Sequence, residues 1–289
     1  MTTRVAVAAQ AKLNLWLRIL AREESGYHSI ETLFHRIKLC DDVTVTVARD
    51  AERRVTCSVD VGPETDNLAF RAAELYCSAV GWQTGYHIAI TKRIPAAGGL
   101  GGGSADAAAT LRALNVMSPS PVTDAELCEL GSRLGADIPF LLSDAPCALA
   151  WGHGDRMLKL SALPQKHVAL VLPPFGISTA EAYRMAEVGE RRTGEQLRSD
   201  DLSDWSSVAR LSGNDLSASG AVRAHGRLAG AIEALRDAGA AIAEMTGSGS
   251  VLFGIFGSRP DSGALERATG WPVVLTRTSL NVEGARRLD

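Results

Sequence analysis

The sequence lacks several features that would each have assigned it to a class of proteins. It has no large excess of charge of either sign, because 30 Lys and Arg residues oppose 33 Asp and Glu residues. A chain with a net charge of −3 generates no global basic field, and it carries no stripe of basic and aromatic residues. We therefore expect neither nucleic acid nor an anionic membrane surface as a partner. No apolar run approaches the roughly 20 residues of a membrane-spanning helix, and we find no internal repeat.

Cysteine is also scarce. The cysteines are odd in number, scattered along the chain and not spaced like metal ligands, so we expect reduced thiols that mostly fill the core. The first residues run directly into a strand-like Val5–Val7 without the apolar segment of a signal peptide. These observations predict a cytoplasmic protein. The five cysteines are Cys40, Cys57, Cys77, Cys128 and Cys147.

Glycine, in contrast, is concentrated at one place. Every position of Gly98–Gly103 except Leu100 is glycine. An alternating segment at 87–91 precedes this loop and predicts a strand. An Ala-rich run at 105–114 follows it and predicts a helix, with Ser104 as the expected N-cap. Backbone N–H groups and the helix dipole at such a junction hold an anion. The natural anion is a nucleotide polyphosphate.

Two well-known phosphate loops fit these residues less well. A Walker loop requires a Lys directly after its last glycine, and none stands here. A dinucleotide fingerprint can be built from Gly99, Gly101 and Ser104. However, the loop begins at Pro95, lies late in the chain, and has no acidic residue in 115–123, where a ribose ligand is expected. A Rossmann-type oxidoreductase remains an alternative that protection against heating by ATP or by NAD would test. A flexible glycine linker is disfavoured, because a helix follows immediately.

The segment Pro95–Ala109 resembles the ATP-binding loop of the GHMP small-molecule kinases. The run Gly101–Ser104 is similar to the loop sequence of one branch of these kinases, which phosphorylates 4-diphosphocytidyl-2-C-methyl-D-erythritol. Ala97 stands where that branch usually has glycine. The resemblance implies a two-domain α/β fold of α+β two-layer type. An N-terminal ATP-loop domain would span 1–162 and a ferredoxin-like C-terminal domain 163–289, with the active site between them. It also implies ATP and Mg²⁺, with Ser104 as a possible metal ligand. The implied ATP-binding loop residues are Pro95, Gly98, Gly99, Leu100, Gly101, Gly102, Gly103 and Ser104.

The N-terminal segment has a period of two from Lys12 onward. Lys12 and Asn14 share one face of the expected strand, and Leu13, Leu15 and Leu17 share the other. Taken alone, this predicts a half-buried strand with a solvated lysine. Together with Tyr27 and His28, however, the segment resembles the N-terminal motif of the same kinase branch. That resemblance implies that Lys12 lies beside the phosphoryl acceptor, with Asn14 at the substrate, and that Tyr27 and His28 hold its cytosine.

Asp137 is a carboxylate among apolar residues. It could cap a short helix that contains Pro139, or it could be a functional acid. The segment Gly135–Phe140 resembles the family segment that carries the catalytic Asp. We therefore expect Asp137 to accept or orient the proton of the substrate hydroxyl. Lys12 would stand at about 3–4 Å from it and offset the developing negative charge.

The remaining candidate residues each have a purely structural interpretation as well. Asn67 is a predicted helix N-cap and, by resemblance, an adenine ligand. Tyr183 is either an interfacial Tyr or the second aromatic around the cytosine. Asn214 stands at the start of a predicted helix, in a segment that resembles a short family signature with an orienting hydrogen-bond role. A small-residue loop between apolar strands is either a tight hairpin or the third family motif, suited to a diphosphate. Its residues are Thr246, Gly247, Ser248 and Gly249.

These motifs imply an enzyme that uses ATP to phosphorylate the 2-hydroxyl of 4-diphosphocytidyl-2-C-methyl-D-erythritol, a step of the non-mevalonate isoprenoid precursor pathway. A GHMP kinase for homoserine or mevalonate would keep the fold and change the acceptor. A nucleic-acid-binding protein of related fold is disfavoured by the charge. We expect a monomer or a homodimer. The segments Val43–Val47 and Val55–Val61 also predict a β-hairpin across a charged turn.

Overall fold

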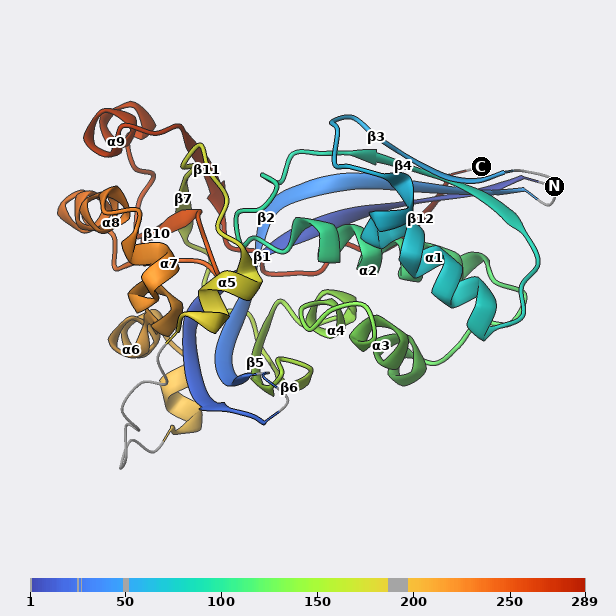
Figure 1. The fold of residues 1–289 in the computed structure, drawn as a ribbon, viewed down its shortest axis with the longest axis horizontal. Coiled ribbons are helices and arrows are strands. Elements are labelled where there is room, and N and C mark those ends of the chain that lie inside the picture. Colours follow the sequence, from blue (N-terminus) through green and yellow to red (C-terminus); the bar gives the residue numbers. More distant parts are fainter. Residues whose placement is uncertain (1, 25, 27, 49–51, 187–196, 289) are drawn as a thin grey trace.

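The computed structural model describes residues 2–24, 26, 28–48, 52–186 and 197–288, and Figure 1 draws their arrangement. Two β-sheets form the framework, and each carries helices. The described part of the chain contains no helix long and apolar enough to cross a bilayer.

The first sheet is built around two long antiparallel strands, β1 (Thr3–Arg22) and β2 (His28–Ala48). In the described residues it has eight strands, with β12, β1, β2, β4 and β3 adjacent in that order. Strands β5 and β6 extend it from the other part of β2, and β8 pairs with β1. The further strands are β3 (Arg53–Cys57), β4 (Gly85–Thr91), β5 (Cys147–Gly152), β6 (Arg156–Leu160), β8 (Gly213–Asn214) and β12 (Arg286–Leu288).

Helices cover one face of this sheet (Figure 1). Helix α2 packs against β1, β2 and α1, and the side that it buries consists largely of alanine, which allows close approach. Helix α3 begins with a capping box between Thr123 and Glu126. The helical segments are η1 (Glu64–Asp66), α1 (Leu68–Ala79), α2 (Gly102–Met117), α3 (Asp124–Ser132) and α4 (Ile138–Leu142).

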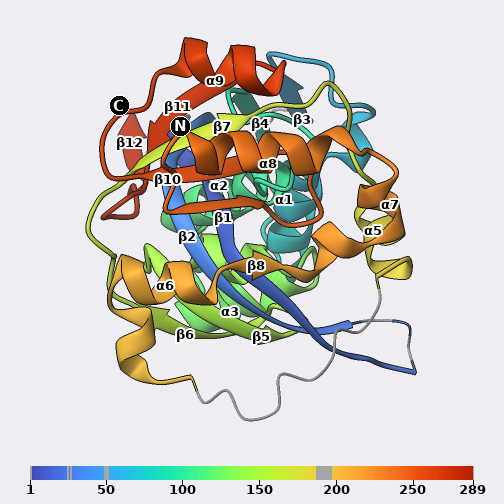
Figure 2. The ribbon, with the colours of Figure 1, turned by 90° about the vertical axis from the view of Figure 1, so that its left-hand side faces the viewer.

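The second sheet has the ferredoxin-like arrangement that the resemblance implies. Its strands are β7 (His167–Val171), β9 (Ile242–Met245), β10 (Leu252–Phe256) and β11 (Val273–Arg277), in the spatial order β11-β7-β10-β9. This is the fourth, first, third and second strand of a βαββαβ unit. Helices α8 (Arg227–Asp237) and α9 (Ser262–Thr269) cover its outer face (Figure 2). The connection from β7 to α8 carries α5 (Thr179–Arg184), η2 (Ser199–Leu202), α6 (Trp205–Leu211), η3 (Asp215–Ala218) and α7 (Gly220–Arg223).

Two segments that follow residue 162 return to the first sheet. Strand β8 pairs with β1 at Trp16 and Leu17, and β12 pairs with β1 near its start. The division at 162/163 therefore remains a prediction about where the chain changes domain.

The predicted hairpin between β2 and β3 is wrong. Strand β4 lies between them, so that β3 pairs with β4 in parallel and β4 pairs with β2 in antiparallel fashion. The strand also ends at Cys57, and Val59 and Val61 are exposed. A local turn signal predicts that a chain reverses, but it does not predict which strand becomes the neighbour.

The simple alternation along β1 is also interrupted. Register shifts between Gln10 and Lys12 and between Asn14 and Trp16 mark β-bulges. A bulge changes the face on which the following side chains lie. Leu17 consequently packs in the second core, against the ferredoxin-like unit, whereas Leu13 and Leu15 pack in the first.

Candidate active site

A cleft of about 1190 Å³ lies between the glycine loop, the start of α4, α5 and the loop that joins β9 to β10. Most residues that the sequence analysis selected line it. Thr246 and Asn214 do not, and Tyr27 lies outside the described residues. The selected residues at the cleft are Lys12, Asn14, His28, Asn67, Pro95, Gly98, Gly99, Leu100, Gly101, Gly102, Gly103, Ser104, Asp137, Tyr183, Gly247, Ser248 and Gly249.

The glycine loop ends at the N-terminus of α2, three residues earlier than predicted. Gly101, at φ = 72°, is the N-cap, and Ser104 lies in the first turn without capping it. The first bonded amide of the helix is that of Ala105, which donates to Gly101 O at 2.8 Å. The preceding amides, of Gly102, Gly103 and Ser104, therefore have no partner within the helix. These three residues line the cleft, and free amides at a helix N-terminus can bind an anion there.

Lys12 and Asp137 meet beside this loop. Lys12 Nζ lies 3.2 Å from Asp137 Oδ2, and the side chains are 4% and 30% exposed. A Cβ placed on Gly101 would lie 3.1 Å from Lys12 Cε and 3.6 Å from Asp137 Oδ2. The ammonium, the carboxylate and the start of α2 thus share one small region of the cleft.

Asp137 could have been only a helix cap, but its side chain does not have that role. It stands at the N-cap of α4 and makes no capping hydrogen bond. Its carboxylate faces Lys12 instead. Asn67, in contrast, caps α1 as predicted, because its Oδ1 accepts from Ala69 N at 2.9 Å.

Asn14 fixes Lys12 from the other side. Its Oδ1 accepts from Lys12 Nζ at 2.7 Å, and its Nδ2 donates to Thr32 Oγ1 at 2.8 Å. The amide is therefore occupied by the protein, and Asn14 is 3% exposed. This position suits a residue that orients the lysine.

The second small-residue loop interlocks with the glycine loop. Thr246, which is fully buried, accepts from Asn14 N at 3.1 Å, and its hydroxyl lies 3.3 Å from Gly99 O. Asn214 holds the same loop from behind, because its Nδ2 donates to Met245 O and Gly247 O at 2.7 and 2.8 Å. Thr246 therefore supports the loop from inside, while Gly247, Ser248 and Gly249 face the cleft.

His28 and Tyr183 form the aromatic end of the cleft. Their rings lie 5.4 Å apart between centroids and are tilted by 37°. Burial and the charge of Arg22 lower the pKa of His28, and its Nε2 has no hydrogen-bond partner among the described residues. Burial and the nearby Asp137 charge raise the pKa of Tyr183. A neutral imidazole with an open ring nitrogen beside a phenol ring suits a planar heterocycle.

A charged cluster at the opposite end of the cleft was missed by the sequence analysis. Lys92 Nζ lies 2.5 Å from Asp41 Oδ2 and 2.6 Å from Asp106 Oδ2. Asp41 also accepts from the backbone of Arg93 and Ile94 and so fixes the start of the glycine loop. Burial raises the pKa of Asp106 to about 7, although Lys92 opposes this. The available signal was a single carboxylate within the Ala-rich run.

Comparisons with known proteins agree with this geometry. Residues 67–148 match the N-terminal domain model of the GHMP kinases, and residues 195–269 match their C-terminal model. The 4-diphosphocytidyl-2-C-methyl-D-erythritol kinase of Geobacter metallireducens is 36% identical over 94% of this chain and 98% of its own length. The enzyme of the same name from Pelotomaculum thermopropionicum is 38% identical over 95% of this chain and 98% of its own length. The chain belongs to the 4-diphosphocytidyl-2-C-methyl-D-erythritol kinase family.

Solved structures agree with this membership. A 4-(cytidine 5′-diphospho)-2C-methyl-D-erythritol kinase superposes with a TM-score of 0.76 at 32% identity, covering 95% of this chain and 99% of the other. Homoserine kinase from Cytophaga hutchinsonii has a TM-score of 0.71 at 15% identity, with 99% and 97% covered, which shows a shared fold alone. As a member of this kinase family, the chain is an ATP-using phosphotransferase. The oxidoreductase and nucleic-acid-binding alternatives are thereby excluded.

Proposed function

We propose that this kinase transfers the γ-phosphoryl group of ATP to the 2-hydroxyl of 4-diphosphocytidyl-2-C-methyl-D-erythritol, in the non-mevalonate isoprenoid pathway. The observation that carries the proposal is the ion pair of Lys12 and Asp137 at 3.2 Å, in the cleft beside the start of α2. Phosphoryl transfer requires chiefly positioning and charge stabilisation, and this arrangement supplies both.

The glycine loop and the first turn of α2 are assigned to the ATP phosphates. Their free amides and the helix dipole favour negative charge. Asn67, at the start of α1, is assigned to the adenine, in addition to its role as a cap. Gly103 and Leu68 stand close together, since a Cβ on Gly103 would lie 3.5 Å from Leu68 Cδ1. This proximity supports the assignment of an adenine site next to the phosphate site.

Lys12 and Asp137 are assigned to the transfer itself. The hydroxyl oxygen of the acceptor forms a bond to the γ-phosphorus, while the bond from that phosphorus to the bridging oxygen of ADP breaks. Asp137 accepts the hydroxyl proton or orients it, and Lys12 offsets the negative charge that develops. Asn14 keeps the ammonium in place.

The acceptor is assigned to the other half of the cleft. His28, Tyr183 and Tyr27 would hold the cytosine, supported by the tilted pair of His28 and Tyr183. The loop of Gly247, Ser248 and Gly249 would contact the diphosphate, with Thr246 as its internal support. This division leaves the hydroxyl between the two halves, at the ion pair.

We assign the Ser104 hydroxyl to Mg²⁺. The described residues contain no group of three or more His, Cys, Asp and Glu side chains that could hold a metal. Mg²⁺ in nucleotide enzymes usually takes only one or two protein oxygens, with phosphates and water completing its shell. One hydroxyl at the start of α2 fits that pattern. When bound, the ion neutralises phosphate charge.

Two finer expectations remain predictions. The five cysteines, all unpaired thiols in the structure, support a cytoplasmic location. The monomer or homodimer state is the second, and light scattering tests it.

The test is a coupled ADP-release assay with the cytidine substrate, homoserine and mevalonate side by side. We expect turnover with the cytidine substrate alone. Asp137→Asn should lower kcat about 10²-fold or more and leave ATP binding intact. Turnover with homoserine or mevalonate would refute the acceptor, and near-normal turnover of Asp137→Asn would refute the assigned base.

A further inference from the structure

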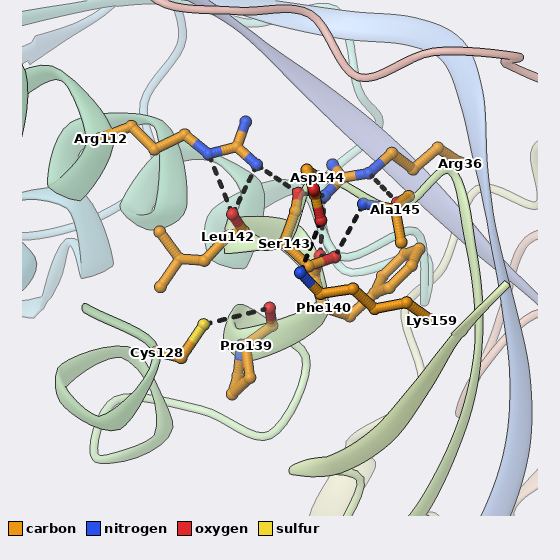
Figure 3. A network of polar contacts seen from close by, with 10 residues as sticks. All are labelled: Arg36, Arg112, Cys128, Pro139, Phe140, Leu142, Ser143, Asp144, Ala145 and Lys159. Carbon is orange, nitrogen blue, oxygen red and sulfur yellow. Dashed lines mark hydrogen bonds and ion pairs between the residues drawn. The ribbon is translucent and has the colours of Figure 1, made fainter. Parts of the chain in front are cut away.

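Two arginines far apart in sequence bind the same short helix (Figure 3). Arg36, from β2, donates to Phe140 O at 2.7 Å, Ser143 O at 3.1 Å and Ala145 O at 3.1 Å. Arg112, from α2, donates to Leu142 O at 2.7 Å and to Ser143 O at 2.6 Å. All of these acceptors are main-chain carbonyls at the end of α4 or just beyond it.

The helix needs such partners. Helix α4 has only five residues, and a helix of that length is unstable in isolation. The last carbonyls of a helix have no partner within it, and a positive charge near them is favourable. The two guanidinium groups meet both requirements.

Arg36 is unusual for a basic residue, because it is only 2% exposed. Among the described residues no carboxylate lies within ion-pair distance of it. Burial and the charge of Arg112 lower the pKa of Arg36 to about 9, although the charge of Asp144 opposes this, so Arg36 remains a cation at neutral pH. Burying a cation that has no ion-pair partner is costly. The benefit that offsets this cost has to be found in what the bound carbonyls hold in place.

The N-terminal end of α4 carries the residue that these contacts hold in place. Asp137 immediately precedes this helix, and its carbonyl accepts from Leu141 N at 3.1 Å. The backbone of Asp137 therefore moves with α4. Its carboxylate has no capping bond that would fix it locally.

The strand that carries Arg36 also supports Lys12. Arg36 stands directly opposite Lys12 in the pairing of β2 with β1. Phe34, two residues away, stacks on Phe140 of α4 at 5.0 Å, and Lys12 Nζ lies 5.4 Å from the Phe34 ring. Arg36 itself lies over the Phe140 ring at 4.9 Å. These contacts set the position of α4 relative to Lys12.

Arg112 makes the corresponding link to the phosphate loop. It lies on α2, ten residues after Gly102, where that helix begins. That is about 15 Å along a helix axis. The rigid body that presents the phosphate-binding amides therefore also holds α4.

We propose that Arg36 and Arg112 form a guanidinium clamp that positions Asp137 against Lys12 and the glycine loop. Both are positioning residues, since neither contacts the cleft. The proposal rests on the role of Asp137 proposed above.

The test uses Arg36→Lys and Arg112→Lys, which keep the charge and remove the planar fork of donors. In each folded variant we expect kcat to fall about tenfold to a hundredfold, as for a small misplacement of a catalytic group. KM for ATP and for the cytidine substrate should stay within about twofold. Arg53→Lys is the matched control, because Arg53 makes an exposed ion pair with Glu74. It should keep the wild-type kcat.

The decisive measurement is the same substitution in an Asp137→Asn background, with each protein assayed well below its melting temperature. If the clamp acts through Asp137, it has no further effect on kcat once the carboxylate is gone. An equal loss in both backgrounds, or wild-type kcat in both single variants, overturns the clamp. If Arg36→Lys does not fold, the comparison of Arg112→Lys in the wild-type and Asp137→Asn backgrounds is sufficient for the test. A wild-type rate for Asp137→Asn would instead overturn the proposed role of Asp137 and leave the proposed reaction standing.

Discussion

Replacing Gly99 by alanine tests the interlock of the two loops at the active site. Gly99 has φ = 78°, a conformation that L-residues adopt at a cost of about 1 kcal/mol. Its new Cβ would also lie only 2.0 Å from Thr246 O and 3.2 Å from Gly249 N. The atoms in the way belong to the backbone, so no side-chain rotation can relieve the overlap.

The magnitude follows from the contacts that must be given up. To clear the Cβ, the second loop has to move away, which weakens the contact of Thr246 Oγ1 with Gly99 O and the bond from Val251 N to Gly98 O. Each net hydrogen bond contributes about 1 kcal/mol. Together with the backbone strain, we expect a loss of about 3 kcal/mol in the free energy of unfolding.

Gly103→Ala is the control in the same loop. Gly103 lies in the first turn of α2 without a positive φ, and its nearest contact would be Leu68 Cδ1 at 3.5 Å, an ordinary van der Waals distance. Alanine is favoured over glycine in a helix by up to about 1 kcal/mol. The midpoint of urea unfolding should therefore move to a lower urea concentration for Gly99→Ala, and it should stay unchanged or move to a higher one for Gly103→Ala. Equal shifts in the two variants would refute the interlock.

Three further predictions concern the two ends of the cleft and its centre. Lys12→Met should lower kcat about 10²-fold with ATP affinity unchanged in a fluorescence titration; normal turnover would remove Lys12 from the mechanism. His28→Ala should raise KM for the cytidine substrate about tenfold, the loss of roughly 1.4 kcal/mol of aromatic and hydrogen-bond contact, and should leave KM for ATP unchanged. Asp106→Asn should gain stability relative to wild type as the pH rises from 5 to 7. The raised pKa of Asp106, about 7, means that the fold disfavours its ionised form, whereas the unfolded chain is already ionised. At about 1.4 kcal/mol per pH unit, the gain approaches 2 kcal/mol. Urea midpoints of both proteins at pH 5 and pH 8 measure it, and a difference that does not vary with pH would contradict it.

Local features were predictable from the sequence because their causes are local. The caps at Asn67, Thr123 and Ser178 each depend on a side chain and an amide two or three residues away. The helix after the glycine loop was predicted as well, but its start was not. Ser104 is a good capping residue, yet Gly101 in a left-handed conformation begins the helix earlier. The earlier start makes the free amides those of Gly102, Gly103 and Ser104, which line the cleft.

The supports of the site could not be predicted, because their partners lie far away in sequence. Asn14 contacts Thr246, 232 residues later, and Arg36 contacts Phe140, 104 residues later. Arg36 lies in a stretch with other basic and polar residues and has no pattern that indicates complete burial. The family resemblance supplied Lys12 and Asp137 as candidates for the transfer, whereas the residues that hold them in place required the structure.

Ala97 shows how this chain accommodates a departure from its relatives. The sequence analysis noted it where the related branch usually has glycine, and the structure places it at φ = 54°, the one positive value among the described non-glycine residues. The cost of about 1 kcal/mol for such a conformation has to be met by the surroundings. A Cβ on Gly176, in the segment that leads to α5, would lie 3.1 Å from the Ala97 Cβ, so the methyl group packs against the C-terminal part of the molecule. Ala97 thus adopts a strained backbone conformation in the glycine loop, and its methyl group contacts the segment that leads to α5. A substitution at Gly176 would test this contact, because any larger residue there must displace the glycine loop, to which we assign the ATP phosphates.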